Sequence, residues 1–374
     1  MKQQVRFCTS SDGVRIAWCV TGAGAPLVMS ASWLTHLEHQ WDSLAWRPWL
    51  EHFSQSHALL RYDSRGCGLS DRAVGDVSFE SWMRDFEAVT DAAGFDRFAI
   101  LATCQGGPIA VEYAARHPER VSKLVIYGSY ARGLAKRSDS PEQAKKARVL
   151  LDMLQLGWGI DNHAFLLLWA SLFQQGGSQE HLRSWSEQMR LSTSAEMAAR
   201  LLEITFNTDA RKAAAQVRCP TLIINADRDP MVPIEEGRIL ASLIPGARFV
   251  QLSSKNHMLL PKEPAWNRLV TEVESFLAEP ETPRPVNSRA RFADLTVRER
   301  AVLTAMAAGL GNAEIAVQFD LAEKTVRNHV TRVFDKIGVR HRYQAIVLAR
   351  DAGLANEPSS AFGLPGTLVP DYAP

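Results

Sequence analysis

Cysteine is scarce in this 374-residue chain and shows none of the patterns that bind a metal or form a disulfide framework. The five cysteines are Cys8, Cys19, Cys67, Cys104 and Cys219. Because their number is odd and no CxxC pair occurs, we expect neither a disulfide framework nor a zinc module. The sequence also lacks a cluster of metal ligands and a phosphate-binding glycine loop, so we expect no metal and no cofactor.

Long apolar runs and strong charge are missing as well. The N-terminal segment MKQQVRFCTSSDG has no apolar core of the kind that a secretory signal needs, and no run approaches membrane-spanning length. The formal net charge of +1 excludes a generally basic coat protein. We therefore expect a cytoplasmic protein with no membrane partner.

The length leaves room for two domains of ordinary size. Residues 279–291, EPETPRPVNSRAR, are rich in proline and charge and predict a linker. Residues 355–374 are rich in proline, glycine and serine and predict a disordered tail. The chain is therefore divided into a large domain over 1–278 and a small domain over 292–354.

In the large domain, short apolar runs alternate with helical segments such as 106–116 and 234–243. The runs are ALLRY (58–62), FAILA (98–102), KLVIY (123–127), TLIIN (221–225) and RFVQL (248–252). Such buried strands separated by helices predict a mostly parallel sheet with helices on both faces. Before them, residues 14–20 predict an antiparallel lead-in and residues 26–30 a further strand.

One strand end carries a candidate nucleophile. The run FAILATCQGG leads into Cys104, with Ala102 and Gly106 two residues to either side. Small residues are required there when a strand turns sharply into a helix and exposes a nucleophile at the turn. Further along the chain, Asp229 follows the predicted strand 221–225 and His257 follows the predicted strand 248–252, which gives the order nucleophile, acid, base.

With these features, the large domain resembles the α/β-hydrolase superfamily. The supporting motifs are RYDSRGCGLSD (61–71), DPMVP (229–233) and IPGARFVQL (244–252). The resemblance implies that Cys104 is the nucleophile, His257 the base and Asp229 the orienting acid. Asp227 is an alternative acid, although the DPMVP spacing favours Asp229.

The same resemblance implies an oxyanion hole and a lid. The backbone N–H of Gln105 would be one oxyanion donor. The family usually has His-Gly in the loop after residues 26–30, whereas this chain has Ala31 and Ser32, so Trp33 is the expected second donor. Residues 128–218 occupy the place of the lid.

The lid predicts an apolar pocket above the nucleophile. Its aromatic residues include Trp158, Phe165, Trp169 and Phe173. Most of them are expected to pack helices, and a few to cover a pocket that suits a small hydrophobic ester, lactone or aromatic compound. Asp63 and Arg65 are expected to brace the turn beneath the site. His36 and His39 are expected to lie on the surface or behind the pocket wall.

The small domain carries a helix-turn-helix pattern within residues 295–345. In its third helix one apolar stripe consists of Val326, Val330, Val333, Phe334 and Ile337. The opposite side carries donors for phosphates and base edges, namely Lys324, Arg327, Asn328, Thr331 and Arg332. A basic excess supports this reading, since residues 289–351 hold eleven Lys and Arg against seven Asp and Glu.

This pattern resembles the LuxR-type helix-turn-helix. The matching positions include Leu295, Thr296, Arg298, Glu299, Gly309, Asn312, Glu314, Ile315, Thr325, Val326, Arg327, Lys336, Gly338 and Ala345. The resemblance implies double-stranded DNA as partner, residues 323–336 as recognition helix and the final helix as the contact of a homodimer. Ala322 departs from the family's usual serine cap, and Ala313 from its usual lysine.

Three functions are compatible with these two modules. The favoured one is a regulator of transcription that senses a small ligand in its hydrolase-like domain. The second is an active Cys-dependent ester or lactone hydrolase with a DNA-binding appendage. In the third, the hydrolase fold only dimerises, which the intact Cys-His-Asp set disfavours. Fold alone does not decide whether this set turns over.

Overall fold

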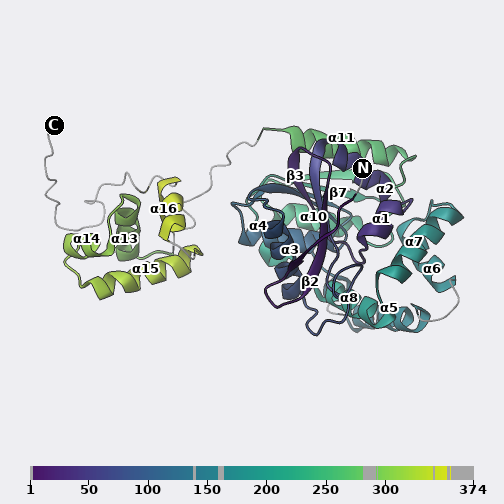
Figure 1. Cartoon of the computed structure of the whole chain (residues 1–374), viewed down its shortest axis with the longest axis horizontal. Coiled ribbons are helices and arrows are strands. Elements are labelled where there is room, and N and C mark those ends of the chain that lie inside the picture. Colours follow the sequence, from purple (N-terminus) through teal and green to yellow (C-terminus); the bar gives the residue numbers. More distant parts are fainter. Residues whose placement is uncertain are drawn as a thin grey trace. The chain divides into compact units, whose positions relative to one another are not determined.

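The chain forms two compact units, Met1–Glu281 and Thr282–Pro374, in the computed structural model (Figure 1). The structure describes residues 3–137, 140–158, 164–280, 292, 294–339, 342–351 and 354. Residues 281–291 of the predicted linker and the whole predicted tail at 355–374 lie outside these ranges. Each unit is described by itself below.

An eight-stranded sheet forms the centre of the large unit, in the order β1-β2-β4-β3-β5-β6-β7-β8. Its strands are β1 (Arg6–Thr9), β2 (Arg15–Thr21), β3 (Ala25–Ser30), β4 (His57–Tyr62), β5 (Phe98–Thr103), β6 (Val121–Tyr127), β7 (Thr221–Ala226) and β8 (Arg248–Leu252). The pairs β1–β2 and β2–β4 are antiparallel, and the remaining pairs are parallel. The predicted parallel sheet with an antiparallel lead-in is confirmed.

Burial explains why the central strands were recognisable in the sequence. Every residue of β5 and β7 is buried, as expected for strands covered on both faces. In contrast, β1 is largely exposed and was not predicted, because its four residues contain no apolar run.

Helices lie on both sides of this sheet (Figure 1). They are α1 (Leu37–Asp42), α2 (Arg47–Ser56), α3 (Phe79–Ala92), α4 (Gly106–Arg116), α10 (Ile234–Leu243) and α11 (Pro264–Ala278). The predicted helices at 106–116 and 234–243 correspond to α4 and α10. Ser78 caps α3, accepting a hydrogen bond from the Ser81 backbone N–H at 3.1 Å.

A helical insertion lies between β6 and β7, where the lid was expected. It consists of the 3-10 helix η1 (Leu134–Lys136), α5 (Pro141–Trp158), α6 (Ala164–Phe173), α7 (Gln179–Ser192), α8 (Ala195–Asn207) and α9 (Arg211–Ala214). The buried faces of these helices join the main hydrophobic core of the large unit.

The small unit is helical and has a hydrophobic core of its own. Its helices are α13 (Val297–Ala307), α14 (Asn312–Gln318), α15 (Glu323–Ile337) and α16 (Arg342–Asp351). Ala322 precedes α15 and makes no side-chain cap hydrogen bond, as the departure from serine predicts. Gly338 ends α15 in the left-handed region, with φ at 71°.

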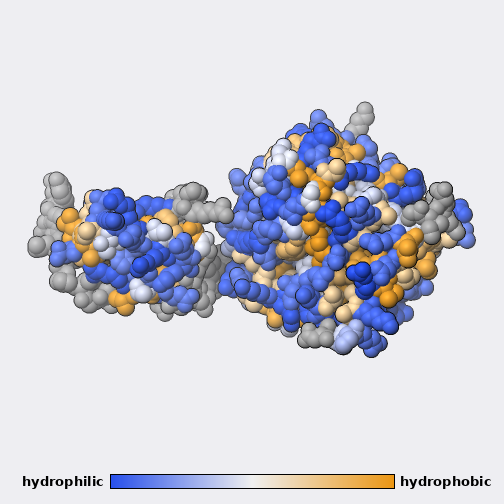
Figure 2. Space-filling view, turned by 90° about the horizontal axis from the view of Figure 1, so that it is seen from below, coloured by the Kyte–Doolittle hydropathy of each residue, from blue (hydrophilic) through white to orange (hydrophobic). Residues whose placement is uncertain are grey.

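Hydrophilic side chains cover most of the face shown in Figure 2, and hydrophobic ones form smaller patches between them. This distribution follows from the burial of the apolar strands and helix faces in the two cores. Among the described helices, none combines the length and apolar character needed to cross a membrane.

Candidate active site and DNA-binding face

Cys104 lies at the sharp turn between β5 and α4. Its φ of 50° is in the left-handed region, which is rare for a residue with a side chain and stores local strain. Small neighbours make the turn possible. A Cβ on Gly106 would lie 3.0 Å from the backbone oxygens of Ser30 and Ala31, and one on Gly107 would lie 2.0 Å from Ser129 Oγ. The Ser129 hydroxyl also donates to the Cys104 carbonyl at 2.5 Å.

Asp229 and His257 form a buried pair. Their Oδ2 and Nδ1 atoms are 2.6 Å apart. The other oxygen of Asp229 accepts hydrogen bonds from the backbone N–H groups of Met231 and Val232, at 2.8 and 3.1 Å. These bonds fix the carboxylate, and the carboxylate fixes the imidazole ring, which leaves Nε2 as the nitrogen available to a nucleophile.

The environment of His257 favours its protonated form. Burial lowers the pKa of this imidazole, but the charge and hydrogen bonds of Asp229 and Cys104 outweigh burial and raise the pKa well above 6.5. His257 can therefore hold a proton taken from a neighbouring thiol.

The alternative acid, Asp227, has a different set of partners. Its Oδ1 accepts from the Ser254 backbone N–H at 3.1 Å and contacts Arg228, so it braces the loop after β8. The geometry thus brings Asp229, and not Asp227, to His257.

The residues of the expected oxyanion donors are next to Cys104, since Gln105 follows it in the chain and Trp33 lines the same pocket. Trp33 and Gln105 are both buried, and within the described residues neither backbone N–H donates a hydrogen bond to the protein. Unpaired backbone donors at a strand-to-helix turn are suited to an oxygen that gains charge during acyl transfer.

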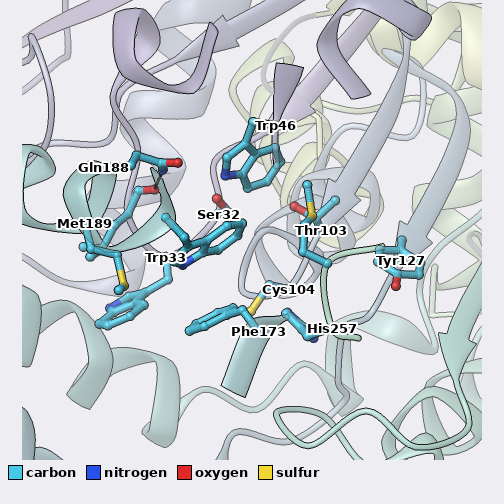
Figure 3. Close-up of a pocket in the computed structure, with 13 residues that line it drawn as sticks. Ser32, Trp33, Trp46, Thr103, Cys104, Tyr127, Phe173, Gln188, Met189 and His257 are labelled. Carbon is cyan, nitrogen blue, oxygen red and sulfur yellow. Dashed lines mark hydrogen bonds between the residues drawn. The ribbon is translucent and has the colours of Figure 1, made fainter. Parts of the chain in front are cut away.

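A narrow apolar pocket of about 30 Å³ opens onto Cys104. Its wall is made by Ser32, Trp33, Leu34, Trp46, Thr103, Cys104, Tyr127, Phe173, Trp185, Gln188, Met189, His257 and Met258. In Figure 3 the Cys104 sulfur lies among Trp33, Phe173 and His257. The space holds about two water molecules at roughly 10–15 Å³ each, so a larger ligand must displace side chains of the wall.

The structure assigns the remaining expected residues to supporting places. The Arg65 guanidinium is fully buried and binds the carboxylates of Asp85 and Asp12, each at 2.7 Å. The carboxylate of Asp63 accepts from the backbone N–H groups of Leu37 and Leu69. Both brace loops near the site. His36 is buried, its ring centre lies 4.2 Å from that of His39, and it is not part of the pocket wall.

Several wall residues were not predicted from the sequence. Trp46 precedes α2, and Trp185, Gln188 and Met189 belong to α7 of the lid. The segment 179–192 is mostly polar, and its buried positions recur at helical spacing. That spacing was the available signal, but it does not say which helix face covers the pocket.

The five predicted DNA contacts lie on the exposed face of α15. Lys324, Arg327, Asn328, Thr331 and Arg332 are all exposed, whereas Val326, Val330, Val333 and Ile337 are buried. Arg327 forms a surface ion pair with Glu323 at 3.1 Å. Such an exposed pair is weak and leaves the guanidinium available to a stronger partner.

Comparison with known families identifies both units. A model of the α/β-hydrolase fold matches residues 33–264, which is more than half of the chain. The chain belongs to the α/β-hydrolase family. A model of the LuxR family of bacterial regulatory proteins matches residues 293–349. The C-terminal unit is therefore a LuxR-type helix-turn-helix domain, a module that binds DNA.

The large unit is similar to several hydrolases. The chain is 28% identical over 233 residues to 2-hydroxymuconate semialdehyde hydrolase of Pseudomonas putida, covering 60% of this chain and 79% of the relative. It is 28% identical over 244 residues to pimeloyl-acyl-carrier-protein methyl ester esterase of Nitrosomonas europaea, covering 63% and 90%. The enol-lactonase of Burkholderia xenovorans has the same fold, with a TM-score of 0.59 at 24% identity over 73% of this chain and all of the lactonase.

Proposed function

We propose that this protein is a LuxR-type regulator of transcription whose hydrolase-fold unit senses a small, mostly apolar ester, lactone or aromatic compound. The observation that carries the proposal is the buried Asp229–His257 pair beside Cys104, in the same chain as a LuxR-type module. The names of similar proteins, an esterase and a lactonase among them, support an acyl compound as the ligand.

The site can transfer an acyl group to sulfur. Nε2 of His257 takes the proton of the Cys104 thiol, and the sulfur attacks the acyl carbon. The backbone N–H groups of Gln105 and Trp33 stabilise the oxyanion, and His257 returns the proton to the departing alcohol. The product is a thioester on Cys104. Water then attacks the thioester, with His257 as base, and releases the acid and the free thiol.

The second step decides between sensor and enzyme. When hydrolysis is slow, the thioester persists, and a lid closed over an acylated Cys104 is a distinct state of the large unit. A ligand changes DNA affinity only through its different affinity for two states of the protein. The lid is suited to differ between them, since Trp185, Gln188 and Met189 of α7 form part of the pocket wall.

On the DNA side, we assign α15 to the major groove. Its exposed donors, Lys324, Arg327, Asn328, Thr331 and Arg332, would contact phosphates and base edges. The LuxR-type module favours a homodimer on a near-palindromic site, with α16 as the dimer contact.

The test follows the acyl group and the DNA affinity in one preparation of the full chain. An operator is first selected from random-sequence DNA. The protein is then treated with 4-nitrophenyl acetate, peptide mass mapping locates the acetyl group, and fluorescence anisotropy measures operator affinity before and after treatment. We expect a lasting acetyl group on Cys104 and an operator affinity that changes by about fivefold or more.

Other outcomes favour other functions. Repeated turnover of the ester with unchanged operator affinity would favour an active Cys-dependent hydrolase with a DNA-binding appendage. An operator response retained in Cys104→Ala would show that ligand binding suffices without acylation. The absence of both acylation and operator response would contradict the sensor and the hydrolase alike.

A further inference from the structure

The pocket wall combines parallel aromatic faces with unpaired polar atoms. Phe173 of the lid stacks on Trp33, with an angle of 5° between the ring planes and 6.2 Å between their centres. Trp185 stacks on Trp46, with 19° between the ring planes and 5.9 Å between the ring centres. It also stacks on Phe173, with 28° between the planes and 5.1 Å between the centres. A flat ring between Trp33 and Phe173 needs about 3.5 Å on each side, so these two faces must separate, and their near-parallel orientation keeps that displacement small.

Gln188 presents an acceptor to this pocket. The side chain is 4% exposed, and its Nε2 donates to the Leu34 carbonyl at 3.4 Å. That bond fixes the orientation of the amide, so that Oε1 is the free end. Within the described residues Oε1 has no hydrogen-bond partner.

Trp46 presents a donor to the same pocket. Its side chain is 3% exposed, and its indole N–H has no acceptor among the described residues. The buried indoles of Trp18 and Trp82 also lack an acceptor, but neither of them contributes to the pocket wall. An unpaired indole alone is therefore not the signal. The pocket differs because its wall combines an unpaired acceptor, Gln188 Oε1, with unpaired donors, namely the indole N–H groups of Trp33 and Trp46 and the hydroxyls of Thr103 and Tyr127.

These polar atoms lie away from the nucleophile. In Figure 3, Cys104 and His257 are at one end of the pocket, Gln188 and Trp46 are at the other, and Trp33 lies between them. A hydroxyl offers the donor that Gln188 Oε1 lacks and the acceptor that the Trp46 N–H lacks. Burying each of these atoms without a partner costs free energy that such a hydroxyl would recover.

We infer that the ligand is a flat aromatic ester or lactone with a hydroxyl on the ring, at the end opposite the reacting carbonyl. The inference rests on the proposed function of this pocket and specifies its ligand class. The ring packs between Trp33 and Phe173, the carbonyl faces Cys104, and the hydroxyl pairs with Gln188 and Trp46.

Binding is measured by calorimetry with the unreactive full-length variant Cys104→Ala. The probes are methyl 4-hydroxybenzoate, methyl benzoate, which lacks the hydroxyl, and methyl 4-hydroxycyclohexanecarboxylate, which lacks the flat ring. We expect methyl 4-hydroxybenzoate to bind about tenfold more tightly than methyl benzoate. We expect it to bind roughly three- to tenfold more tightly than the cyclohexane analogue.

Variants then assign the preference to atoms. Trp46→Phe keeps an aromatic ring without the N–H, and Gln188→Leu removes the acceptor. In either variant the preference for the hydroxyl should fall to about twofold, while methyl benzoate binds as before. Trp82→Phe is the matched control, because it removes an unpaired indole N–H outside the pocket, and it should keep the full preference.

Equal affinity for the three probes, or no binding at all, would overturn the inference. A hydroxyl preference that survives in both Trp46→Phe and Gln188→Leu would also overturn it. These measurements need neither acylation nor DNA. If the wild type is acylated by 4-nitrophenyl acetate but Cys104→Ala shows no ring or hydroxyl preference, the ligand class is wrong and the proposed function stands. If Cys104→Ala shows the preference but the wild type gives neither acylation nor an operator response, the ligand class stands and the proposed function is wrong.

Discussion

The Thr205 hydroxyl of lid helix α8 donates a hydrogen bond of 2.9 Å to the side-chain oxygen of Gln105, the residue that directly follows Cys104. Both side chains are buried. The backbone N–H of Gln105 is a proposed oxyanion donor, so one hydrogen bond joins the lid to the residue that carries this donor. A displacement of α8 would therefore shift Gln105 and, with it, the backbone N–H proposed to stabilise the oxyanion.

Thr205→Val removes this hydroxyl and nearly preserves side-chain shape. The loss of one buried hydrogen bond, worth about 0.5–1.5 kcal/mol, should slow acylation of Cys104 by roughly two- to tenfold. Release of 4-nitrophenolate from 4-nitrophenyl acetate measures the rate. Thr205→Ser retains the hydroxyl and should acylate at about the wild-type rate. Because this variant also loses the methyl group, such a rate would show that lost packing does not cause the slower acylation of Thr205→Val. Equal rates in Thr205→Val and wild type would show that α8 does not act on the turn at Cys104.

The two candidate acids, Asp229 and Asp227, provide a direct test of which carboxylate orients His257. Asp229→Asn removes the charge that holds the imidazole, and we expect acylation to slow by roughly 10²- to 10⁴-fold. Asp227→Asn is the matched control, because Asp227 braces a loop and does not reach His257. It should acylate at nearly the wild-type rate. The same nitrophenolate assay applies, and a larger loss in Asp227→Asn would reverse the assignment.

The strand-to-helix turn at Cys104 could be predicted from the local sequence. The run FAILATCQGG combines a fully buried strand with small residues around Cys104, and each of these features is a short-range requirement. The strand lengths, α4 and α10 were predictable for the same reason, since hydrophobic spacing within a segment reports its own burial.

The far end of the pocket could not be predicted, because it depends on long-range packing. Trp46 and Trp185 are 139 positions apart in sequence numbering and stack at 5.9 Å only in the folded chain. Nothing in the sequence around Gln188 distinguishes it from other polar residues of α7. The role proposed for Gln188 as an acceptor depends on the hydrogen bond from its Nε2 to the Leu34 carbonyl, which leaves Oε1 free.

A substitution of Gly107 tests the packing around the turn at Cys104. Ala at this position would place Cβ 2.0 Å from Ser129 Oγ, so either α4 or the Ser129 loop must shift. We expect Gly107→Ala to lower the free energy of unfolding by about 1–3 kcal/mol. Gly75→Ala is the control, because nothing lies within 4 Å of its added Cβ. Tryptophan fluorescence during urea unfolding reports on this unit, since every tryptophan precedes residue 267. Equal midpoints for the two variants would contradict the predicted clash.

Arg327 tests the DNA-binding face. If its guanidinium contacts a base, Arg327→Ala should weaken operator binding by about 1–3 kcal/mol and relax the sequence preference at one position. If Lys324 contacts a phosphate, Lys324→Ala should weaken binding to all sequences about equally. It should also reduce the slope of log affinity against log salt concentration by about one. Arg268→Ala removes an exposed arginine of the large unit and serves as the charge control. Anisotropy titrations at several salt concentrations separate these cases, and unchanged binding by both α15 variants would exclude α15 as the recognition helix.

Glu299 joins the start of α13 to the end of α15. Its carboxylate is buried, accepts from the Thr296 backbone N–H at 2.9 Å and pairs with Lys336 Nζ at 2.7 Å. Burial raises the pKa of Glu299, but the hydrogen bonds to Lys336 and Thr296 outweigh burial and lower the pKa from 4.5 to about 2. A lowered folded-state pKa means that the charged form stabilises the fold above pH 4.5, and that this stability is lost as the pH falls through about 2.

Glu299→Gln should therefore destabilise the small unit by about 1–3 kcal/mol at neutral pH, and its difference from wild type should shrink as the pH falls from 4.5 toward 2. Glu314→Gln is the matched control, because Glu314 accepts from the Gly311 N–H at an exposed helix start. Hydrogen exchange of peptides from α13 and α15, compared with wild type at each pH, measures the effect in the full chain. A difference that stays constant down to pH 2 would show that Glu299 stabilises the unit through packing, since loss of an ion pair must follow the protonation of its carboxylate.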